Sequence, residues 1–451
     1  MKFANEIVNR AFFEEIRILQ EEKLRSQLSY CYNNSEYYRE RFHSFGVHPL
    51  DIRTLDDFRQ LPIFMTKEDE RKSQRESMER FGHPFGMHLC ARLEELALTS
   101  TTSGTSGTPT FTYTFSKRDI HGPVADLWAF MFRNVGVRPG DRVLFAYALG
   151  IYATSMLLWG IRKMGALPID VDVRSGADAV LQYALLTKPV SFATTPSLCE
   201  YLIHRAPASI GKDVGDLGFK SLLLCGEPGP GIPEIKKKLE DAYKARVYDY
   251  WSPGGLAFGL SCDSDEYHGL HCYAPDYNLA QDDLVDPETK KPIDSIEGAI
   301  GEMVHTSLDR DACPAIRYAY GDIVQVFTDA CPACGFRGKR LKFIGRSDDM
   351  LIVKGANIYP AAIQEIVSSF IPRVTGAMKI VLEVPPPRVK PPLKIKVEFG
   401  EGIESRKLPE LAKEIKAVCR HRIKLNPEII WVPPKTFDRS LRKTSPFEKS
   451  Y

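Results

Sequence analysis

The sequence predicts an α/β protein with two parts: a large N-terminal domain of mainly parallel sheets flanked by helices, and a small, mobile C-terminal α+β domain. Two observations lead to this prediction. Between residues 110 and 260, apolar strand-like runs alternate with amphipathic helical stretches, which is typical of βαβ units. After residue 345 a shorter segment alternates strands and helices again around proline-rich turns. A length of 451 residues fits two or three domains.

The large domain is predicted to cover residues 1–345 in three stretches. Residues 1–90 are charged and show helical spacing of apolar side chains. Residues 91–260 form the α/β core, and residues 261–345 are polar, rich in Asp and turns, and predict mixed, short antiparallel strands. The strands expected in the core are residues 142–146, 167–171, 221–225 and 246–250, with a helix over 233–245.

The C-terminal domain is predicted to cover residues 346–451. Strands are expected at 379–382 and 393–399, and helices at 361–369 and 411–420. Prolines at 385–387 and 391–392 mark the loop between the two strands.

The composition is that of a globular protein, with 43% hydrophobic and 26% charged residues. A formal charge of +2 argues against nucleic acid or an anionic membrane as the main partner, because such surfaces attract a large basic excess. The sequence shows no apolar run long enough to span a bilayer. We therefore expect a cytoplasmic enzyme and leave its oligomeric state open, with a homodimer as one arrangement.

Four of the ten cysteines, Cys262 with Cys272 and Cys331 with Cys334, lie in polar, turn-rich sequence that is typical of metal ligands. Cys331 and Cys334 form a Cys-x-x-Cys knuckle, and Cys262 precedes His268 and His271. Three thiolates and one imidazole make a closed tetrahedral set typical of structural zinc. The spacing Cys262-x₅-His268 is the tighter of the two, and free thiols on a loop are the alternative.

The most distinctive local feature is the loop at residues 99–109, which consists almost entirely of Ser, Thr and Gly before an expected strand. Backbone N–H groups and hydroxyls in such a loop can surround phosphate oxygens, and Gly permits a close approach. The loop lacks the Gly-Lys-Ser/Thr ending of a Walker P-loop. A flexible linker is the alternative interpretation.

Several segments together resemble one family. The loop resembles the Ser-Gly-Thr-Thr-Gly-x-Pro phosphate signature, and residues 225–228 (Cys-Gly-Glu-Pro) resemble a Gly-Ala-Glu-Pro turn beside adenine. Residues 316–322 resemble Arg-Tyr-Arg-Thr-Gly-Asp, residues 345–360 resemble the hinge segment, and residues 37–42 and 61–67 resemble the N-terminal helical region. Over essentially its whole length, the chain resembles the phenylacetate–coenzyme A ligase-like members of the adenylate-forming (acyl/aryl-CoA synthetase) superfamily.

The resemblance implies which residues bind ATP. The phosphate loop is Ser103, Gly104, Thr105, Ser106, Gly107 and Thr108. The remaining nucleotide residues are Gly226, Glu227, Pro228, Asp249, Tyr250, Trp251, Ser252, Asp322 and Arg346. Asp322 would accept hydrogen bonds from the ribose hydroxyls, although an ordinary turn Asp is the alternative. Arg346 would reach ribose or phosphate, unless it is a surface residue paired with Asp348.

The resemblance also implies roles for the C-terminal domain. Asp348 is the expected hinge, and Gly355 is expected beside the coenzyme A channel. The adenylation lysine aligns with Lys443, although Leu441 and Arg442 replace the family's Glu-Gly pair, so Lys435 is the alternative. A mobile lysine acts there as a point charge that bridges the carboxylate and the α-phosphate.

Two further assignments follow from the resemblance. An acid pocket is expected at Tyr147, Gly150 and Tyr152, where the rings would stack on an aromatic acid. Packing at a strand end is an equal alternative for both tyrosines. For the zinc site, the match at Gly269-Leu270-His271 slightly favours His271 over His268.

One departure concerns magnesium. The family shows Tyr-Gly-x-Thr/Ser-Glu after the adenine-side strand, but in this chain Pro253 takes the place of the Glu. Three explanations stay open: Mg²⁺ is held mainly by phosphates and water, Asp249 replaces the Glu, or the first half-reaction is impaired.

These residues lead to a main hypothesis and two alternatives. The main one is an acid–thiol ligase that uses ATP, Mg²⁺ and coenzyme A, with an acyl-AMP intermediate, a structural Zn²⁺ and an aryl or aryl-acetic acid as substrate. The first alternative transfers the acyl group to an amine, a hydroxyl or a carrier protein. The second is a catalytically impaired nucleotide-binding relative.

Overall fold

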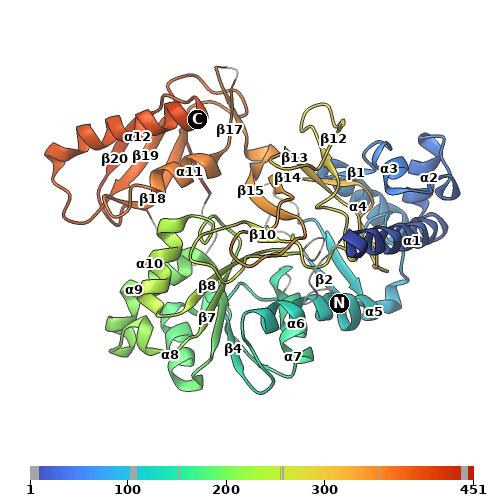
Figure 1. Cartoon of the computed structure of the whole chain (residues 1–451), viewed down its shortest axis with the longest axis horizontal. Helices are drawn as coiled ribbons and strands as arrows, with labels where there is room; N and C mark the ends of the chain where they lie inside the picture. Colours follow the sequence, from blue (N-terminus) through green and yellow to red (C-terminus); the bar gives the residue numbers. More distant parts are fainter. Residues whose placement is uncertain are drawn as a thin grey trace.

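The computed structural model describes residues 10–101, 109–150, 153–253, 255, 258–354, 356–437 and 445–451. It has a large α/β part built on one 13-stranded sheet and a small part built on a four-stranded sheet. Figure 1 shows the N-terminal helices in blue at one end and the small part in orange and red at the other, above α10. The α/β fold class predicted from the sequence is confirmed.

The chain begins with helices that pack against the large sheet. They are α1 (Arg10–Asn34), α2 (Glu36–Ser44), α3 (Leu55–Arg59) and α4 (Lys67–Phe81). α4 begins at a capping box, because the Thr66 side chain accepts from the Asp69 backbone N–H and the Asp69 carboxylate accepts from Thr66. It ends at Gly82, whose φ of 72° is the left-handed conformation that glycine adopts at little cost.

The central block of the large sheet is parallel, in the order β5-β4-β6-β7-β8. Its strands are β4 (Arg142–Phe145), β5 (Leu167–Asp170), β6 (Ser191–Thr194), β7 (Ser221–Leu224) and β8 (Arg246–Trp251). Four of them lie where the sequence predicts strands. β6 is an addition that the sequence analysis did not name.

Helices cover both faces of this block. One face carries α8 (Ala177–Thr187), α9 (Pro196–Ile210) and α10 (Pro233–Tyr243), and the other carries α6 (Ala125–Asn134) and α7 (Leu157–Lys163). In β4, Val143 and Phe145 belong to the core under α6 and α7, whereas Leu144 belongs to the core under α8 to α10. Alternating side chains point to opposite faces, so a strand buried on both faces is apolar at every position.

The rest of the large sheet is antiparallel around a long hairpin of β14 (Tyr318–Phe327) and β15 (Arg340–Arg346). The other strands of this region are β9 (Gly259–Leu260), β10 (Leu270–His271), β11 (Leu284–Val285), β12 (Pro292–Ile293) and β13 (Ile300–His305), and β1 (Met65–Thr66) pairs with β14 in parallel. Two N-terminal strands, β2 (Leu96–Ser100) and β3 (Tyr113–Ser116), form a separate antiparallel pair that flanks the residues of the Ser/Thr/Gly loop.

The small part follows β15. A two-stranded pair, β16 (Leu351–Val353) and β17 (Ala356–Ile358), leads into α11 (Pro360–Ser368). The four-stranded sheet has the order β20-β19-β18-β21, from β18 (Val374–Leu382), β19 (Lys394–Phe399), β20 (Glu428–Val432) and β21 (Phe447–Lys449). α11 and α12 (Leu408–Ile423) complete its apolar core. The boundary predicted between residues 345 and 346 falls just before the last residue of β15.

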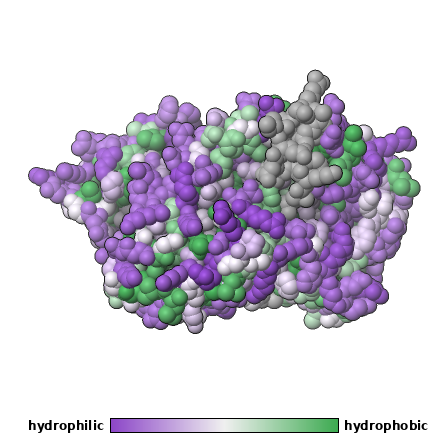
Figure 2. Space-filling view, turned by 60° about the horizontal axis from the view of Figure 1, so that its bottom comes forward, coloured by the Kyte–Doolittle hydropathy of each residue, from purple (hydrophilic) through white to green (hydrophobic). Residues whose placement is uncertain are grey.

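The surface carries no extended apolar face in the view of Figure 2, which is predominantly hydrophilic with small, separate apolar patches. Within the described ranges, no helix combines the length and the apolar character needed to cross a bilayer.

Candidate functional site

A cleft of about 540 Å³ lies between the large and the small part of the molecule. Its walls are the carboxyl ends of β7 and β8, the β14–β15 hairpin, α11 and the start of β18. Ligands of open α/β sheets characteristically bind beyond the carboxyl ends of the strands. The cleft collects all the predicted nucleotide residues that the structure describes: Gly226, Glu227, Pro228, Asp249, Tyr250, Trp251, Ser252, Asp322 and Arg346.

Asp322 and Arg346 face each other across the β14–β15 pair. The Arg346 Nη1 atom lies 2.6 Å from Asp322 Oδ1, and its Nη2 donates to the Tyr320 carbonyl at 3.0 Å. Asp322 is only 2% exposed. Burial lowers the pKa of Arg346, but the carboxylates of Asp322 and Asp348 outweigh this effect and raise the pKa above its usual value. The guanidinium therefore stays charged. The preceding Gly321 has a φ of 100°, and a Cβ there would lie 3.0 Å from Ser347 Oγ, so glycine suits this turn.

Asp348, the predicted hinge residue, receives two cations. Arg346 Nε lies 2.9 Å from its Oδ1, and Lys67 Nζ of α4 lies 2.9 Å from its Oδ2. Burial raises the pKa of the Asp348 carboxyl, but the two cations outweigh this effect and lower it. Lys67 also lies 5.0 Å from the centroid of the Tyr320 ring, so the N-terminal helical region reaches the hinge.

Asp249 is a partly buried carboxyl within β8, two residues before the strand ends. It accepts a hydrogen bond from the Tyr267 hydroxyl at 2.8 Å, while its own backbone N–H donates to Ser261 Oγ at 2.9 Å. Burial raises the pKa of Asp249 to about 7, although the bond from Tyr267 works against the rise. Pro253, which replaces the family's Glu, also lines the cleft and offers no carboxylate.

The turn after β7 contributes Gly226 and Glu227. Gly226 has a φ of 95°, which favours glycine. Glu227 Oε1 accepts from the Ser197 backbone N–H at 2.7 Å, at the N-terminus of α9. A carboxylate is favourable there because the helix dipole places partial positive charge at that end.

The structure places Tyr147 in the core beside the cleft. Its hydroxyl donates to the Thr194 carbonyl at 2.6 Å and lies 2.8 Å from the Tyr250 hydroxyl, and the residue is 5% exposed. Trp128 of α6 packs edge-on against Tyr250, with ring centroids 5.8 Å apart. Tyr147 thus contacts Tyr250, which lines the cleft, but does not itself line it, and its acid-pocket role stays a prediction. Gly150 lies in the loop after β4 with a φ of 84°.

Several predicted residues lie outside the described residues: Tyr152, Gly355, Lys443 and the phosphate loop Ser103, Gly104, Thr105, Ser106, Gly107 and Thr108. The described neighbours of Lys443 in sequence, Phe437 and Ser445, both line the cleft. The alternative lysine, Lys435, has a side chain that is 83% exposed and pairs with Glu401 at 3.3 Å. Lys435 is not among the residues that line the cleft.

A second cluster brings together Cys262, His271, Cys331 and Cys334, whose ligand atoms all lie within 4.8 Å of one another. The Cys262 and Cys331 sulfurs are 4.0 Å apart, and Cys334 Sγ is 3.3 Å from His271 Nε2. A tetrahedral zinc ion with Zn–S bonds of about 2.3 Å needs sulfurs about 3.8 Å apart, so this donor set fits zinc.

The structure also distinguishes the two candidate histidines. His271 lies in β10 between β9 and β15, and its Nδ1 is 3.2 Å from the Gly269 carbonyl oxygen, an arrangement that leaves Nε2 to face the sulfurs. His268 is outside the cluster, with its Nε2 3.9 Å from Glu266.

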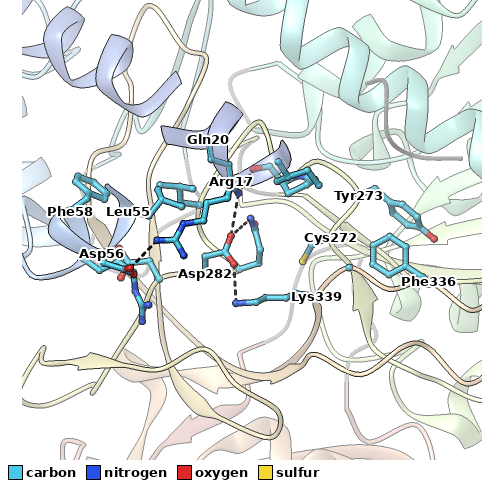
Figure 3. A pocket seen from close by; sticks show the side chains of 17 residues that line it. Arg17, Gln20, Leu55, Asp56, Phe58, Cys272, Tyr273, Asp282, Phe336 and Lys339 are labelled. Carbon is cyan, nitrogen blue, oxygen red and sulfur yellow. Dashed lines mark hydrogen bonds and ion pairs between the residues drawn. The ribbon is translucent and has the colours of Figure 1, made fainter. Parts of the chain in front are cut away.

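Another cavity, of about 280 Å³, lies between α1, α3 and residues 336–339, which follow the Cys331–Cys334 knuckle. Figure 3 shows its charged side chains turned toward one another. Lys339 Nζ lies 2.9 Å from Asp282, and Arg17 lies 2.8 Å from Asp56. Since these charges already neutralise one another, we attribute the cavity to the way α1 and α3 meet residues 336–339.

Sequence reasoning missed some residues of the main cleft. Tyr267 and the pair Lys342 and Glu365 line it. None of the three belongs to a recognisable local motif. Tyr113 also lines the cleft, and its hydroxyl contacts that of Tyr320. The position of Tyr113 just after the Ser/Thr/Gly loop is the one signal that could have identified it.

Comparison with known proteins agrees with this geometry. The family described as AMP-binding enzyme C-terminal domain matches residues 355–447. A phenylacetate-coenzyme A ligase from Thermus thermophilus is 29% identical over 422 residues, covering 91% of this chain and 89% of that protein. Over most of its length this chain is similar to phenylacetate-coenzyme A ligases, and its C-terminal part matches a domain of AMP-binding enzymes.

Solved structures of a 2-hydroxyisobutyryl-CoA ligase also resemble this chain. The post-adenylation state in complex with 2-HIB-AMP matches with a TM-score of 0.85 at 25% identity, covering 98% of this chain and 91% of the other. The thioesterification state with 2-HIB-AMP and CoA matches over the same shares with a TM-score of 0.68 at 26% identity. The arrangement of the two parts is therefore more similar to that of the post-adenylation structure than to that of the thioesterification structure.

Proposed function

We propose that this protein activates a small carboxylic acid with ATP and transfers the acyl group to coenzyme A. In the first half-reaction, a carboxylate oxygen of the acid attacks the α-phosphorus of ATP, pyrophosphate leaves, and an acyl-AMP forms. In the second, the sulfur of coenzyme A attacks the acyl carbon and AMP leaves. The single observation that carries the proposal is the cleft, where Asp322 and Arg346 meet the turns after β7 and β8.

Asp322 is proposed to bind the ribose. Its carboxylate is held by Arg346 and lines the cleft, so it can accept hydrogen bonds from two vicinal hydroxyls. Trp251, which also lines the cleft, offers a ring for the adenine. The Ser103–Thr108 loop is proposed to bind the β- and γ-phosphates with its backbone N–H groups and hydroxyls.

Lys443 is proposed as the catalytic residue of the first half-reaction. Its charge would bridge the attacking carboxylate and the α-phosphate, whose negative charge grows toward the transition state. The cleft lining supports this assignment, because Phe437 and Ser445 enter the cleft on either side of residues 438–444. The exposed Lys435, paired with Glu401, is the weaker candidate.

Magnesium is proposed to be held mainly by the phosphates and water, where it would neutralise charge on the phosphate oxygens. Asp249, which lines the cleft, is the carboxylate that the sequence predicts as a substitute for the family's Glu. A pKa of about 7 leaves this group only partly ionised at neutral pH, so it is a poor resident ligand. Asp249 would become a magnesium ligand only if binding of the cation releases the proton from its carboxyl group.

The acid is proposed to be an aryl or aryl-acetic acid, because the curated relatives are named for phenylacetate. A small aliphatic hydroxy acid is the second candidate. Two observations favour it: the similar solved structures carry a 2-hydroxyisobutyryl adenylate, and the buried Tyr147–Tyr250 hydroxyl pair fills the space beside the cleft. The two classes differ in size, so a panel of acids separates them.

A structural zinc ion is proposed for Cys262, His271, Cys331 and Cys334. Three thiolates and an imidazole leave no open coordination position, so the ion would supply cross-linking and no chemistry. It would join the strand that contains His271 to the knuckle that precedes β15.

The function is tested by measuring pyrophosphate release from ATP with a panel of acids, with and without coenzyme A. Acid-dependent release together with CoA-dependent formation of a thioester is expected. Release that continues without a thioester product would favour an amine or carrier-protein acceptor, and no release with any acid would contradict the proposal.

A further inference from the structure

One ion pair connects the two sides of the hinge within the cleft. Lys342 of β15 approaches Glu365 of α11, with Nζ 3.2 Å from Oε2 and 3.4 Å from Oε1. Their side chains are 30% and 26% exposed, and both residues line the cleft. Because Asp348 lies between them in the sequence, one partner precedes the hinge and the other follows it.

Glu365 has a second cation on its own side of the hinge. Arg422 of α12 approaches Glu365 Oε1 at 2.6 Å. Burial raises the pKa of Glu365, but Arg422 and Lys342 outweigh this effect and lower it, so the carboxylate is ionised at neutral pH. A rotation about the hinge would carry Arg422 together with Glu365 and would separate Lys342 from both. The Lys342–Glu365 contact is therefore specific to one arrangement.

That arrangement is the one that resembles the post-adenylation structure more closely than the thioesterification structure. We propose that Lys342 and Glu365 are positioning residues that hold the small part of the protein in place for acyl-AMP formation and separate when it turns for thioester formation. The proposal rests on the proposed two-step function, and it assigns neither residue a contact with the reacting atoms.

The strength of such a pair suits an equilibrium that must be reversed in every catalytic cycle. Partly exposed ion pairs change an equilibrium by about two- to fivefold, because water and ions screen them and their side chains lose freedom. A much stronger contact would slow the second half-reaction, since the protein must leave this arrangement before coenzyme A can react.

The test measures the two half-reactions separately in Glu365→Gln, in Lys342→Met and in the double variant. Acid-dependent exchange of pyrophosphate into ATP reports the first half-reaction, and thioester formation from supplied acyl-AMP and coenzyme A reports the second. We expect each single variant to slow the first about two- to fivefold and to leave the second unchanged or faster. The double variant should match the single variants, because either one already removes the pair.

The matched control is Glu414→Gln. It breaks the Arg373–Glu414 pair of 2.8 Å, which lies wholly within the small part and has side chains 47% and 43% exposed. This variant should leave the ratio of the two half-reactions unchanged.

The equilibrium between the two arrangements of the small part can also be measured without catalysis, from the distance between two labels. Labels can be introduced through unnatural amino acids at Leu186, which is 76% exposed, and at Arg406, whose side chain is 80% exposed. Each single variant should populate a second label distance more than the wild type does. An unchanged distance distribution in the variants would overturn the proposal for Lys342 and Glu365, whether or not any acid supports turnover. The absence of turnover with every acid would instead contradict the proposed function.

Two kinetic outcomes would also overturn the inference. If the two single effects multiply in the double variant, the residues act independently. If Lys342→Met raises only the KM for ATP and Glu365→Gln does not, Lys342 contacts the nucleotide and does not position the domain.

Discussion

Arg346 binds Asp322 and Asp348 at the same time, with nitrogen–oxygen distances of 2.6 Å and 2.9 Å. Asp322 is the proposed ribose ligand and Asp348 the predicted hinge residue, so one guanidinium joins the proposed nucleotide site to the predicted hinge. The sequence left two interpretations of Arg346 open, a nucleotide ligand or a residue paired with Asp348. The structure shows that the pair with Asp348 exists and that Arg346 also lines the cleft.

Replacing Asp322 by Ala should weaken ATP binding by about 1.5–3 kcal/mol, the usual worth of hydrogen bonds to a charged group. Calorimetric titration with ATP measures the change. Asp294→Ala, at a side chain 88% exposed and outside the cleft lining, is the control and should leave ATP affinity unchanged. If Asp322→Ala binds ATP like the wild type while remaining folded, Asp322 is not a nucleotide ligand.

Lys443→Ala should abolish acyl-AMP formation but leave thioester formation from supplied acyl-AMP nearly intact, because its charge serves only the first transition state. Pyrophosphate exchange and thioester formation are measured separately. Lys435→Ala is the matched control at the other candidate lysine. The opposite result, with Lys435→Ala inactive in the first step and Lys443→Ala active, would show that the sequence alignment is shifted.

The four-residue cluster should hold about one zinc ion per chain, detected by elemental analysis of the purified protein. His271→Ala should lower both the zinc content and the melting temperature, because the metal links segments distant in sequence. His268→Ala is the matched control and should retain the metal. Less than about half an equivalent of zinc in undamaged wild-type protein would rule the site out.

Asp249 should make the stability of the free protein depend on pH. Burial raises its pKa to about 7, well above the unfolded value of about 3.9, so the folded state retains a proton that the unfolded state has lost. Its contribution to stability is complete below about pH 4 and is lost as the pH rises toward about 7.

The matched variant Asp249→Asn has no such proton to lose. It should therefore gain stability relative to the wild type as the pH rises from 4 to 8, measured by chemical denaturation without ATP or Mg²⁺. A constant difference between the two proteins across that range would show that Asp249 is ionised throughout.

The fold was predictable where buried strands appear in the sequence as continuous runs of apolar residues. β4 and β7 are covered by helices on both faces, so residues 143–145 and 222–224 form continuous apolar runs. β6 is equally buried but contains Ser191 and Thr194, which weaken that signal. The Ser191 hydroxyl accepts a hydrogen bond from Ser221 at 3.0 Å, so burying it costs little, and the sequence alone could not reveal this.

By itself, the sequence determined the order of most strands and helices, the kinds of side chain that gather in the cleft, and the cysteine-rich cluster that we propose binds zinc. Tertiary structure decided which residues meet: His271 and not His268 at the thiols, Tyr267 on Asp249, Arg346 between Asp322 and Asp348, and Lys342 opposite Glu365. The physical reason is range. Spacing along the chain controls geometry over a few residues, whereas strand register and the orientation of the two parts set the distances between residues far apart in sequence.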